Sequence, residues 1–204
     1  MGWYSRLVVP RLIDLAMRGK VTTARRVELI PGAGGVVLEV GVGSGLNLPF
    51  YSPAVKRLYG IDPSSELLAM ARKKLERLTF PVELRPESAE QLSLERESVD
   101  TIVMTWTLCS IPDPASALRE MRRVLKPQGR MIFIEHGLAP DASVRAWQDR
   151  LQPIWGKFAG GCHLNRKIDE LLLVGGFRLA ELRTAYLPGP RPFTYTYEGY
   201  AVRP

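Results

Sequence analysis

The chain has 204 residues, of which 46% are hydrophobic and 24% are charged, and its formal net charge is +7. This length predicts one domain with a full core and is too short for two, and the composition is ordinary for a globular protein. No apolar run approaches the roughly 18 residues that a membrane-spanning helix needs. No basic stretch interleaved with aromatic residues indicates a nucleic-acid partner.

Two cysteines, Cys109 and Cys162, do not make a disulfide framework, and the sequence starts without a secretory segment. We therefore expect a cytoplasmic protein in a reducing compartment. The basic residues lie mainly in segments with helical spacing, where they form solvated faces or else attract anionic substrates or a membrane surface weakly.

Residues 3–30 carry apolar side chains at helical spacing, interrupted near Gly19, which predicts two helices ahead of a sheet. A breaker cluster at 31–35 then leads into the apolar run 36–40. This run is short and rich in β-branched residues, so it predicts a strand that is buried on both faces.

Alternating glycines, Gly41, Gly43 and Gly45, follow this strand and favour a nucleotide-binding turn. A ligand can lie against bare backbone there, because glycine has no Cβ and accepts positive φ. A dinucleotide fingerprint would need a further glycine where this chain has Leu46, and here Glu39 stands two positions before the first glycine.

A second apolar run, Leu58–Ile61, ends in Asp62, 21 positions after Gly41. An acidic residue at the tip of a neighbouring strand can accept hydrogen bonds from two ribose hydroxyls. The glycine turn and this carboxylate together predict a site for a ligand that contains adenosine.

The segments 39–45 (Glu-Val-Gly-Val-Gly-Ser-Gly) and 60–64 (Gly-Ile-Asp-Pro-Ser) resemble the class I S-adenosylmethionine-dependent methyltransferases. The resemblance implies an α/β fold: a single-domain, Rossmann-like, seven-stranded sheet, mostly parallel with an antiparallel C-terminal strand pair and helices on both faces. It implies S-adenosyl-L-methionine as cofactor and S-adenosyl-L-homocysteine as product. Residues 1–35 would be lid helices of the same domain, and residues 36–204 the methyltransferase domain. Trp3 and Tyr4 belong either to that lid or to plain packing of the terminus.

Leu46–Tyr51 should start the first crossover helix, with its N-terminal amides toward the cofactor. Asn47 is either a polar contact to the cofactor or the cap of that helix. Pro63–Glu66 begins a helix that continues to Leu78, and Val82–Arg85 alternates like a shorter strand.

The resemblance places the family's adenine-contacting aspartate at Ser88, next to Ala89, so Ser88 or Glu87 would have to substitute for it. The apolar strand Ser98–Thr105 then delivers Thr105 and Trp106 to the carboxyl edge of the sheet, where doubly wound folds hold ligands. Trp106 lines the methyl-transfer pocket or fills the core beneath the lid.

Residues 114–126 predict a helix that Pro127-Gln128-Gly129 stops, and 130–137 predicts a fifth strand ending in Glu135-His136. This pattern resembles the branch of the superfamily with the quinone and sterol C-methyltransferases. An amphipathic insertion (142–158), a helix (168–174) and two alternating strands (177–185 and 194–202) should follow, the strands forming the antiparallel closing pair.

The last third of the chain narrows the resemblance. Trp147-Gln148, Pro153-x-Trp155, Gly161-Cys-His-Leu-x-Arg166 and the closing Gly199-Tyr-Ala-Val resemble the thiol S-methyltransferases of the methyltransferase-like group. The similarity covers nearly all of the chain from about residue 36, and it implies that the partner is a small-molecule acceptor, a small apolar thiol.

Methyl transfer from a sulfonium needs in-line positioning, exclusion of water and sometimes removal of a proton. A thiol with a pKa near ~8.5 is mostly protonated at neutral pH, so a nearby imidazole suffices as its base. His136, on the predicted sheet edge that carries Gly41 and Asp62, is the predicted base or else orients the following loop. Cys162 and His163 have no further cysteine or histidine nearby, so we expect no metal.

The predicted catalytic residues are His136 and Trp106. Two alternatives stay open: a quinone or phospholipid methyltransferase, and a non-catalytic protein that binds an adenosine ligand. The predicted cofactor-binding residues are Glu39, Gly41, Gly43, Gly45, Asn47, Asp62, Pro63, Ser88, Ala89 and Thr105.

Overall fold

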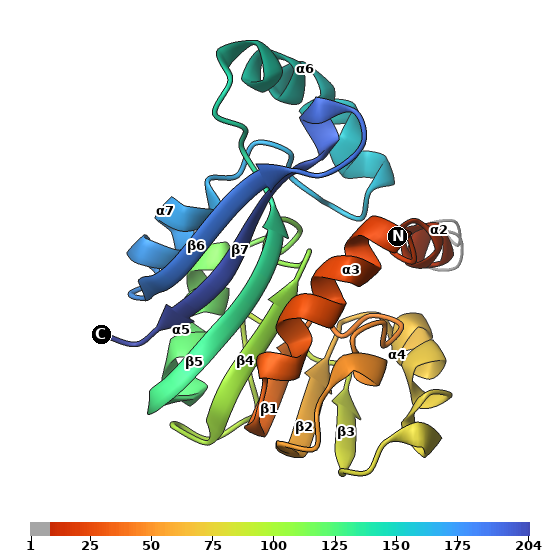
Figure 1. The fold of residues 1–204 in the computed structure, drawn as a ribbon, viewed down its shortest axis with the longest axis vertical. Helices are drawn as coiled ribbons and strands as arrows, with labels where there is room; N and C mark the ends of the chain where they lie inside the picture. The colour runs from red at the N-terminus through yellow and green to blue at the C-terminus, as the bar shows by residue number, and fades with distance from the viewer. Residues whose placement is uncertain (1–8) are drawn as a thin grey trace.

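A single seven-stranded sheet organises the protein, shown in Figure 1 by a computed structural model that describes residues 9–204. The predicted start of the first helix, with Trp3 and Tyr4, lies outside the described residues. The strand order across the sheet is β3-β2-β1-β4-β5-β7-β6. The strands are β1 (Gly35–Val40), β2 (Val55–Ile61), β3 (Val82–Arg85), β4 (Val99–Thr105), β5 (Leu125–His136), β6 (Arg178–Tyr186) and β7 (Tyr195–Val202).

The first five strands run parallel, and β7 pairs antiparallel with both β5 and β6. The predicted mostly parallel sheet with an antiparallel closing pair is therefore confirmed. Parallel neighbours bring the carboxyl ends of β1, β2, β4 and β5 to one edge of the sheet. The α-helices are α2 (Val9–Ala16), α3 (Lys20–Leu29), α4 (Ser65–Arg72), α5 (Pro114–Val124), α6 (Ala142–Phe158) and α7 (Ile168–Val174).

Helices cover both faces of the sheet, as predicted. Along β1, Leu38 joins the core under α5 and α7, whereas its neighbour Val37 joins the core under α3. In Figure 1, α3 crosses in front of β1 and β4, while α5 and α7 lie behind the sheet. Successive strand side chains point to opposite faces, so the central strands need apolar residues at every position.

The predicted crossover helix after Gly45 is wrong. The chain forms only a 3-10 turn, Leu48–Phe50, before β2 begins at Val55. Pro49 lies within this turn and Pro53 follows it, and a proline in a helix interior disrupts the helix because it lacks an amide donor. Leu48 is fully buried, so the turn still covers the sheet.

Two element ends also differ from prediction. The helix after Asp62 ends at Arg72, and a separate 3-10 turn, Leu75–Arg77, follows it. Strand β5 begins at Leu125, five positions before the predicted start at Arg130. Residues 127–129, which the sequence predicts to separate the helix from the strand, instead lie within the strand, where the register with β4 shifts.

Helix α6 extends beyond the carboxyl edge of the sheet (Figure 1), where the sequence predicted an amphipathic insertion. None of the helices within residues 9–204 combines the length and hydropathy that crossing a bilayer requires.

Candidate functional site

The three glycines of the turn after β1 all have positive φ, between 53° and 75°. A Cβ on Gly41 would collide with the side chain of Thr107, and one on Gly45 with Leu48. A Cβ on Gly43 would meet no atom nearer than 3.9 Å. Gly41 and Gly45 are therefore needed for packing, whereas Gly43 borders open space that a ligand can approach.

Asp62 follows β2 and lies beside the same turn. Its Oδ2 accepts a hydrogen bond from the Gly43 amide at 3.0 Å, and its Oδ1 accepts one from the Ser64 amide at 2.8 Å. Burial raises the pKa of this carboxyl, and the two amides oppose that shift. Each carboxylate oxygen can accept a second hydrogen bond, so Asp62 can still bind two ribose hydroxyls.

Glu39 is 1% exposed and anchors a buried polar network. Its Oε1 accepts a hydrogen bond from Asn47 Nδ2 at 2.8 Å, and its Oε2 accepts one from the Tyr51 hydroxyl at 2.9 Å. Asn47 Nδ2 also donates to Thr105 Oγ1 at 3.0 Å. Burial raises the pKa of Glu39 to about 7, although Tyr51, Asn47 and Arg26 oppose it.

Arg26 connects α3 to this network. Its Nε donates to Asn47 Oδ1 at 2.9 Å, and its guanidinium carbon lies 4.9 Å from the centre of the Trp106 ring. Burial lowers the pKa of Arg26 to about 10, and Glu39 partly offsets the effect. Asn47 therefore bridges the helix and the glycine turn and makes no side-chain cap of the following 3-10 turn.

Helix α2 is tied to the glycine turn as well. Ser44 donates its hydroxyl to the Asp14 carboxylate, which also pairs with Arg18 at 2.6 Å. Lys74 Nζ donates to the Ser44 carbonyl at 2.6 Å from the other side. The first two described helices are thus fastened over the turn by buried polar contacts.

The turn after β4 is held by a second buried carboxylate, Glu135. Its oxygens accept hydrogen bonds from the amides of Thr107 at 2.9 Å and Cys109 at 3.3 Å. Burial raises the pKa of Glu135 to about 7. Within this turn Trp106 has a φ of 51°, a conformation that non-glycine residues rarely adopt, and its ring packs on the core under α3.

His136 ends β5 and is 7% exposed. Neither ring nitrogen has a hydrogen-bond partner among the described residues. On the sheet it pairs with Thr196 of β7, and its neighbour Ile134 belongs to the core under α3. The imidazole therefore lies on the α3 face of the sheet, which Trp106 also contacts.

The remaining predicted residues make mostly local contacts. Ser88 Oγ donates to Glu90 at 2.6 Å, Ala89 is buried in the core under α5, and Pro63 is exposed beside Asp62. Ser88 Oγ also accepts a hydrogen bond from the Glu90 amide at 3.3 Å, and its contact with an adenine stays a prediction.

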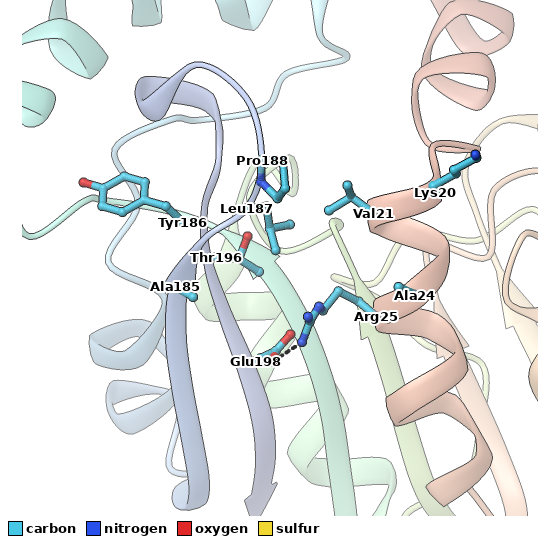
Figure 2. Close-up of a pocket in the computed structure, with 10 residues that line it drawn as sticks. All are labelled: Lys20, Val21, Ala24, Arg25, Ala185, Tyr186, Leu187, Pro188, Thr196 and Glu198. Carbon is cyan, nitrogen blue, oxygen red and sulfur yellow. Dashed lines mark hydrogen bonds and ion pairs between the residues drawn. The ribbon is translucent and has the colours of Figure 1, made fainter.

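A cavity of about 400 Å³ lies between α3 and the ends of β6 and β7. Figure 2 shows Arg25 and Glu198 facing each other across it, with their nearest atoms 3.2 Å apart. None of the glycine-turn residues lines this cavity, but Thr196, the β7 partner of His136, does. The cavity is therefore separate from the glycine turn and lies one strand away from His136, which does not itself line it.

Sequence reasoning missed several residues of the site. Arg26, Tyr51 and Asp14 belong to no motif, and only their positions in predicted helices or loops were visible. No sequence signal identifies them, because their burial and their hydrogen-bond partners are set by residues distant in the chain.

The residues around the glycine turn fit S-adenosylmethionine. Gly43 leaves bare backbone beside Asp62, which suits a ribose, and Glu39 offers a buried carboxylate oxygen for an ammonium group. No group of three or more histidine, cysteine or acidic side chains within residues 9–204 is arranged to hold a metal ion.

Comparisons with known proteins agree with this geometry. Residues 38–133 match a family described as Methyltransferase domain. The chain is 32% identical to the thiol S-methyltransferase TMT1A of Homo sapiens, over 82% of this chain and 70% of that protein. It is 41% identical to the phosphatidylethanolamine N-methyltransferase of Cereibacter sphaeroides, over 58% of this chain and 60% of that protein.

Among solved structures, the fold is similar to a methyltransferase from Thermotoga maritima described as a possible histamine N-methyltransferase. The TM-score is 0.67 at 20% identity, covering 98% of this chain and 100% of that one. This likeness concerns the fold alone. The chain spans only 55% to 60% of the length of three curated relatives that it matches.

Replacing Gly43 by alanine should weaken the binding of S-adenosylmethionine at least tenfold, because a methyl group would enter the space left for the ligand. The positive φ should cost about 1–2 kcal/mol of stability. Calorimetric titration measures the first effect and urea unfolding the second. Unchanged affinity would show that the ligand does not approach this backbone. Gly160→Ala, at a φ of 61° in the loop after α6, is the matched control for the backbone strain.

Glu39 should make the ligand-free protein less stable as pH rises. Its pKa is near 4.5 when unfolded and about 7 when folded, so the folded state alone binds a proton between these values. Stability from this group is therefore full below pH 4.5 and lost as pH approaches 7. Relative to wild type, Glu39→Gln should gain about 1–3 kcal/mol between pH 4.5 and 7.5 in urea unfolding. An equal difference at both pH values would contradict this.

Proposed function

The chain belongs to the S-adenosylmethionine-dependent methyltransferases, and on that premise we propose that it transfers a methyl group from S-adenosylmethionine to the sulfur of a small thiol. The support for sulfur is the similarity to a thiol S-methyltransferase over 82% of the chain, well beyond the cofactor turn. A match over 82% of the chain necessarily extends into the segments after β5.

The observation that carries the proposal is the imidazole of His136, whose ring nitrogens have no hydrogen-bond partner among the described residues although the Cys162 thiol lies near. A buried polar side chain without a hydrogen bond costs stability, and a ligand can supply that bond. A thiol is such a ligand, because it can donate its proton to a neutral ring nitrogen. We propose that the rest of the acceptor occupies the cavity lined by Thr196, the residue that pairs with His136 across β5 and β7.

When bound, S-adenosylmethionine supplies an activated methyl group on a sulfonium. Glu39 and Asn47 would hold its charged amino acid portion, and Asp62 its ribose. Trp106, fixed by the turn and by Arg26, would exclude water from the transfer path. His136 would accept the proton of the acceptor thiol and leave the more nucleophilic thiolate. The product would be S-adenosylhomocysteine.

The described part of residues 1–35 is proposed to act as a lid within the same domain as 36–204. The contacts of Asp14 with Ser44 and of Arg26 with Asn47 support this role, since they close the polar network from above. We also place the protein in the cytoplasm, because its two free cysteines suit a reducing compartment.

A second candidate is methylation of a phospholipid amine. It is favoured by the 41% identity to a phosphatidylethanolamine N-methyltransferase. That match covers 58% of this chain, less than the thiol relative does, and an unpaired histidine would serve an amine nucleophile equally well.

Transfer of an isotope-labelled methyl group to a mixed panel of alkyl thiols, sulfide, quinols and aminophospholipids, read by mass spectrometry, tests the function. We expect label on sulfur. Label on nitrogen or carbon only would establish the second candidate or a related one. Cofactor binding without label on any acceptor would identify a non-catalytic binding protein.

Replacing His136 by glutamine should lower kcat on the preferred thiol by 10²- to 10⁴-fold, the usual contribution of a positioned base. Cofactor affinity measured by calorimetry should change less than threefold, since His136 makes no contact with the glycine turn. The loss should shrink at pH above the thiol pKa, where no base is needed. A lost cofactor affinity would contradict this role.

A further inference from the structure

The two cysteines of the chain, 53 positions apart, lie side by side in the fold. Cys109 belongs to the turn after β4, and Cys162 to the loop between α6 and α7. The His163 amide donates to the Cys109 carbonyl at 2.8 Å, which joins the two backbone segments next to the cysteines. The thiols themselves interact, each affecting the other's proton affinity. The backbone hydrogen bond of His163 holds Cys162, the preceding residue, next to the Cys109 segment, as a bond between the two sulfurs requires.

The two thiols differ in access. Cys109 is 2% exposed, whereas Cys162 is partly exposed. Gly160 and Gly161, just before Cys162, both have positive φ, at 61° and 85°, so the loop turns tightly there. A reagent from solvent would meet Cys162 first, with Cys109 behind it.

The two thiols also differ in charge. Interactions with Cys109, and with the nearby His136 and Trp155, lower the pKa of Cys162. Arg166 adds a positive charge from the same loop region. Burial and the neighbouring Cys162 raise the pKa of Cys109. A partly exposed cysteine among positive groups is the usual setting of a reactive thiolate.

Buried donors near Cys162 are left without partners. The Trp155 indole nitrogen and both ring nitrogens of His136 have no hydrogen-bond partner among the described residues. Both side chains lower the pKa of Cys162, although neither forms a hydrogen bond to it with ordinary distance and angle. The proposed methyl transfer uses His136 but neither cysteine, so the thiol pair needs an explanation of its own.

We propose that Cys162 and Cys109 form a dithiol site that exchanges reversibly with small disulfides. The Cys162 thiolate attacks one sulfur of a disulfide RSSR and expels RS⁻, which leaves a mixed disulfide on Cys162. The Cys109 sulfur then gives up its proton, attacks the Cys162 sulfur and expels the second RS⁻. The net reaction converts RSSR and two cysteine thiols into two RSH and one Cys109–Cys162 disulfide, with the two protons of the cysteines passing to the thiols released.

The second step becomes easier once the first has occurred. The pKa of Cys109 is raised first by the neighbouring Cys162 thiol, followed by burial and by the Cys162 charge. The mixed disulfide removes that charge, so Cys109 loses its proton more readily.

Small disulfides are the oxidised form of the thiols that we propose as methyl acceptors. The connection between disulfide exchange and methyl transfer therefore rests on the proposed function. A Cys109–Cys162 bond would tie the turn that holds Trp106 to the loop that faces His136. We expect methyl transfer to stop in the oxidised protein and to resume when a dithiol reductant is added. Oxidation of the thiol pool would then switch off the enzyme that methylates it.

The test counts free thiols without using methyl transfer. The reduced protein is treated with bis(2-hydroxyethyl) disulfide, quenched in acid, alkylated and weighed by mass spectrometry. Wild type should lose both free thiols without carrying an adduct. Cys109→Ser should accumulate one mixed disulfide, because the attacking cysteine remains and the resolving cysteine is gone. Cys162→Ser should react at least tenfold more slowly than Cys109→Ser.

Two results would overturn the proposal: adducts on both cysteines of wild type, or equal reaction rates of the two variants. Circular dichroism first establishes that each variant folds, and alanine replaces serine where it does not. Methyl transfer with and without the disulfide is measured separately for wild type and Cys162→Ser. If the expected thiol counts are found in a protein that methylates no thiol, that result would support the disulfide-exchange site and refute only the proposed function.

Discussion

The buried carboxylate of Glu39 is the constraint on which the site depends. A carboxylate at 1% exposure is costly unless hydrogen bonds surround it, and here Asn47 and Tyr51 supply them. Satisfying Glu39 fixes Asn47, and Asn47 in turn bonds Thr105 on β4 and Arg26 on α3. One buried charge thus sets the positions of the glycine turn, the neighbouring strand and the covering helix relative to each other.

A second buried carboxylate, Glu135, does the same for the turn after β4. It accepts hydrogen bonds from backbone amides of the turn after β4, and this turn holds Trp106 in its unusual conformation. The next residue of the strand, His136, points to the opposite face of the sheet because strand side chains alternate. At the end of β5, Glu135 therefore stabilises the turn after β4, and His136 places an imidazole on the other face of the sheet.

The relatives of the chain share its cofactor fold but differ in the acceptors that their names state. The parts of this protein that border the cavity, α3 and the ends of β6 and β7, lie largely outside the segment 38–133 that matches the family. In the function that we propose, these elements would determine the choice of acceptor. Cys109 lies in a turn inside the matched segment, and Cys162 lies in a loop outside it.

The sequence by itself determined the strands, their closing antiparallel pair, the glycine turn and Asp62, because these depend on side-chain period and on backbone conformations that few residues adopt. It could not determine that a 3-10 turn containing Pro49 replaces the first crossover helix. The number of residues available between Gly45 and β2 is known only once the start of β2 is known. Arg26 and the contact of Cys109 with Cys162 were likewise decided by the tertiary structure alone. Their roles come from neighbours distant in the sequence, and no local pattern records which distant residue will satisfy a buried charge.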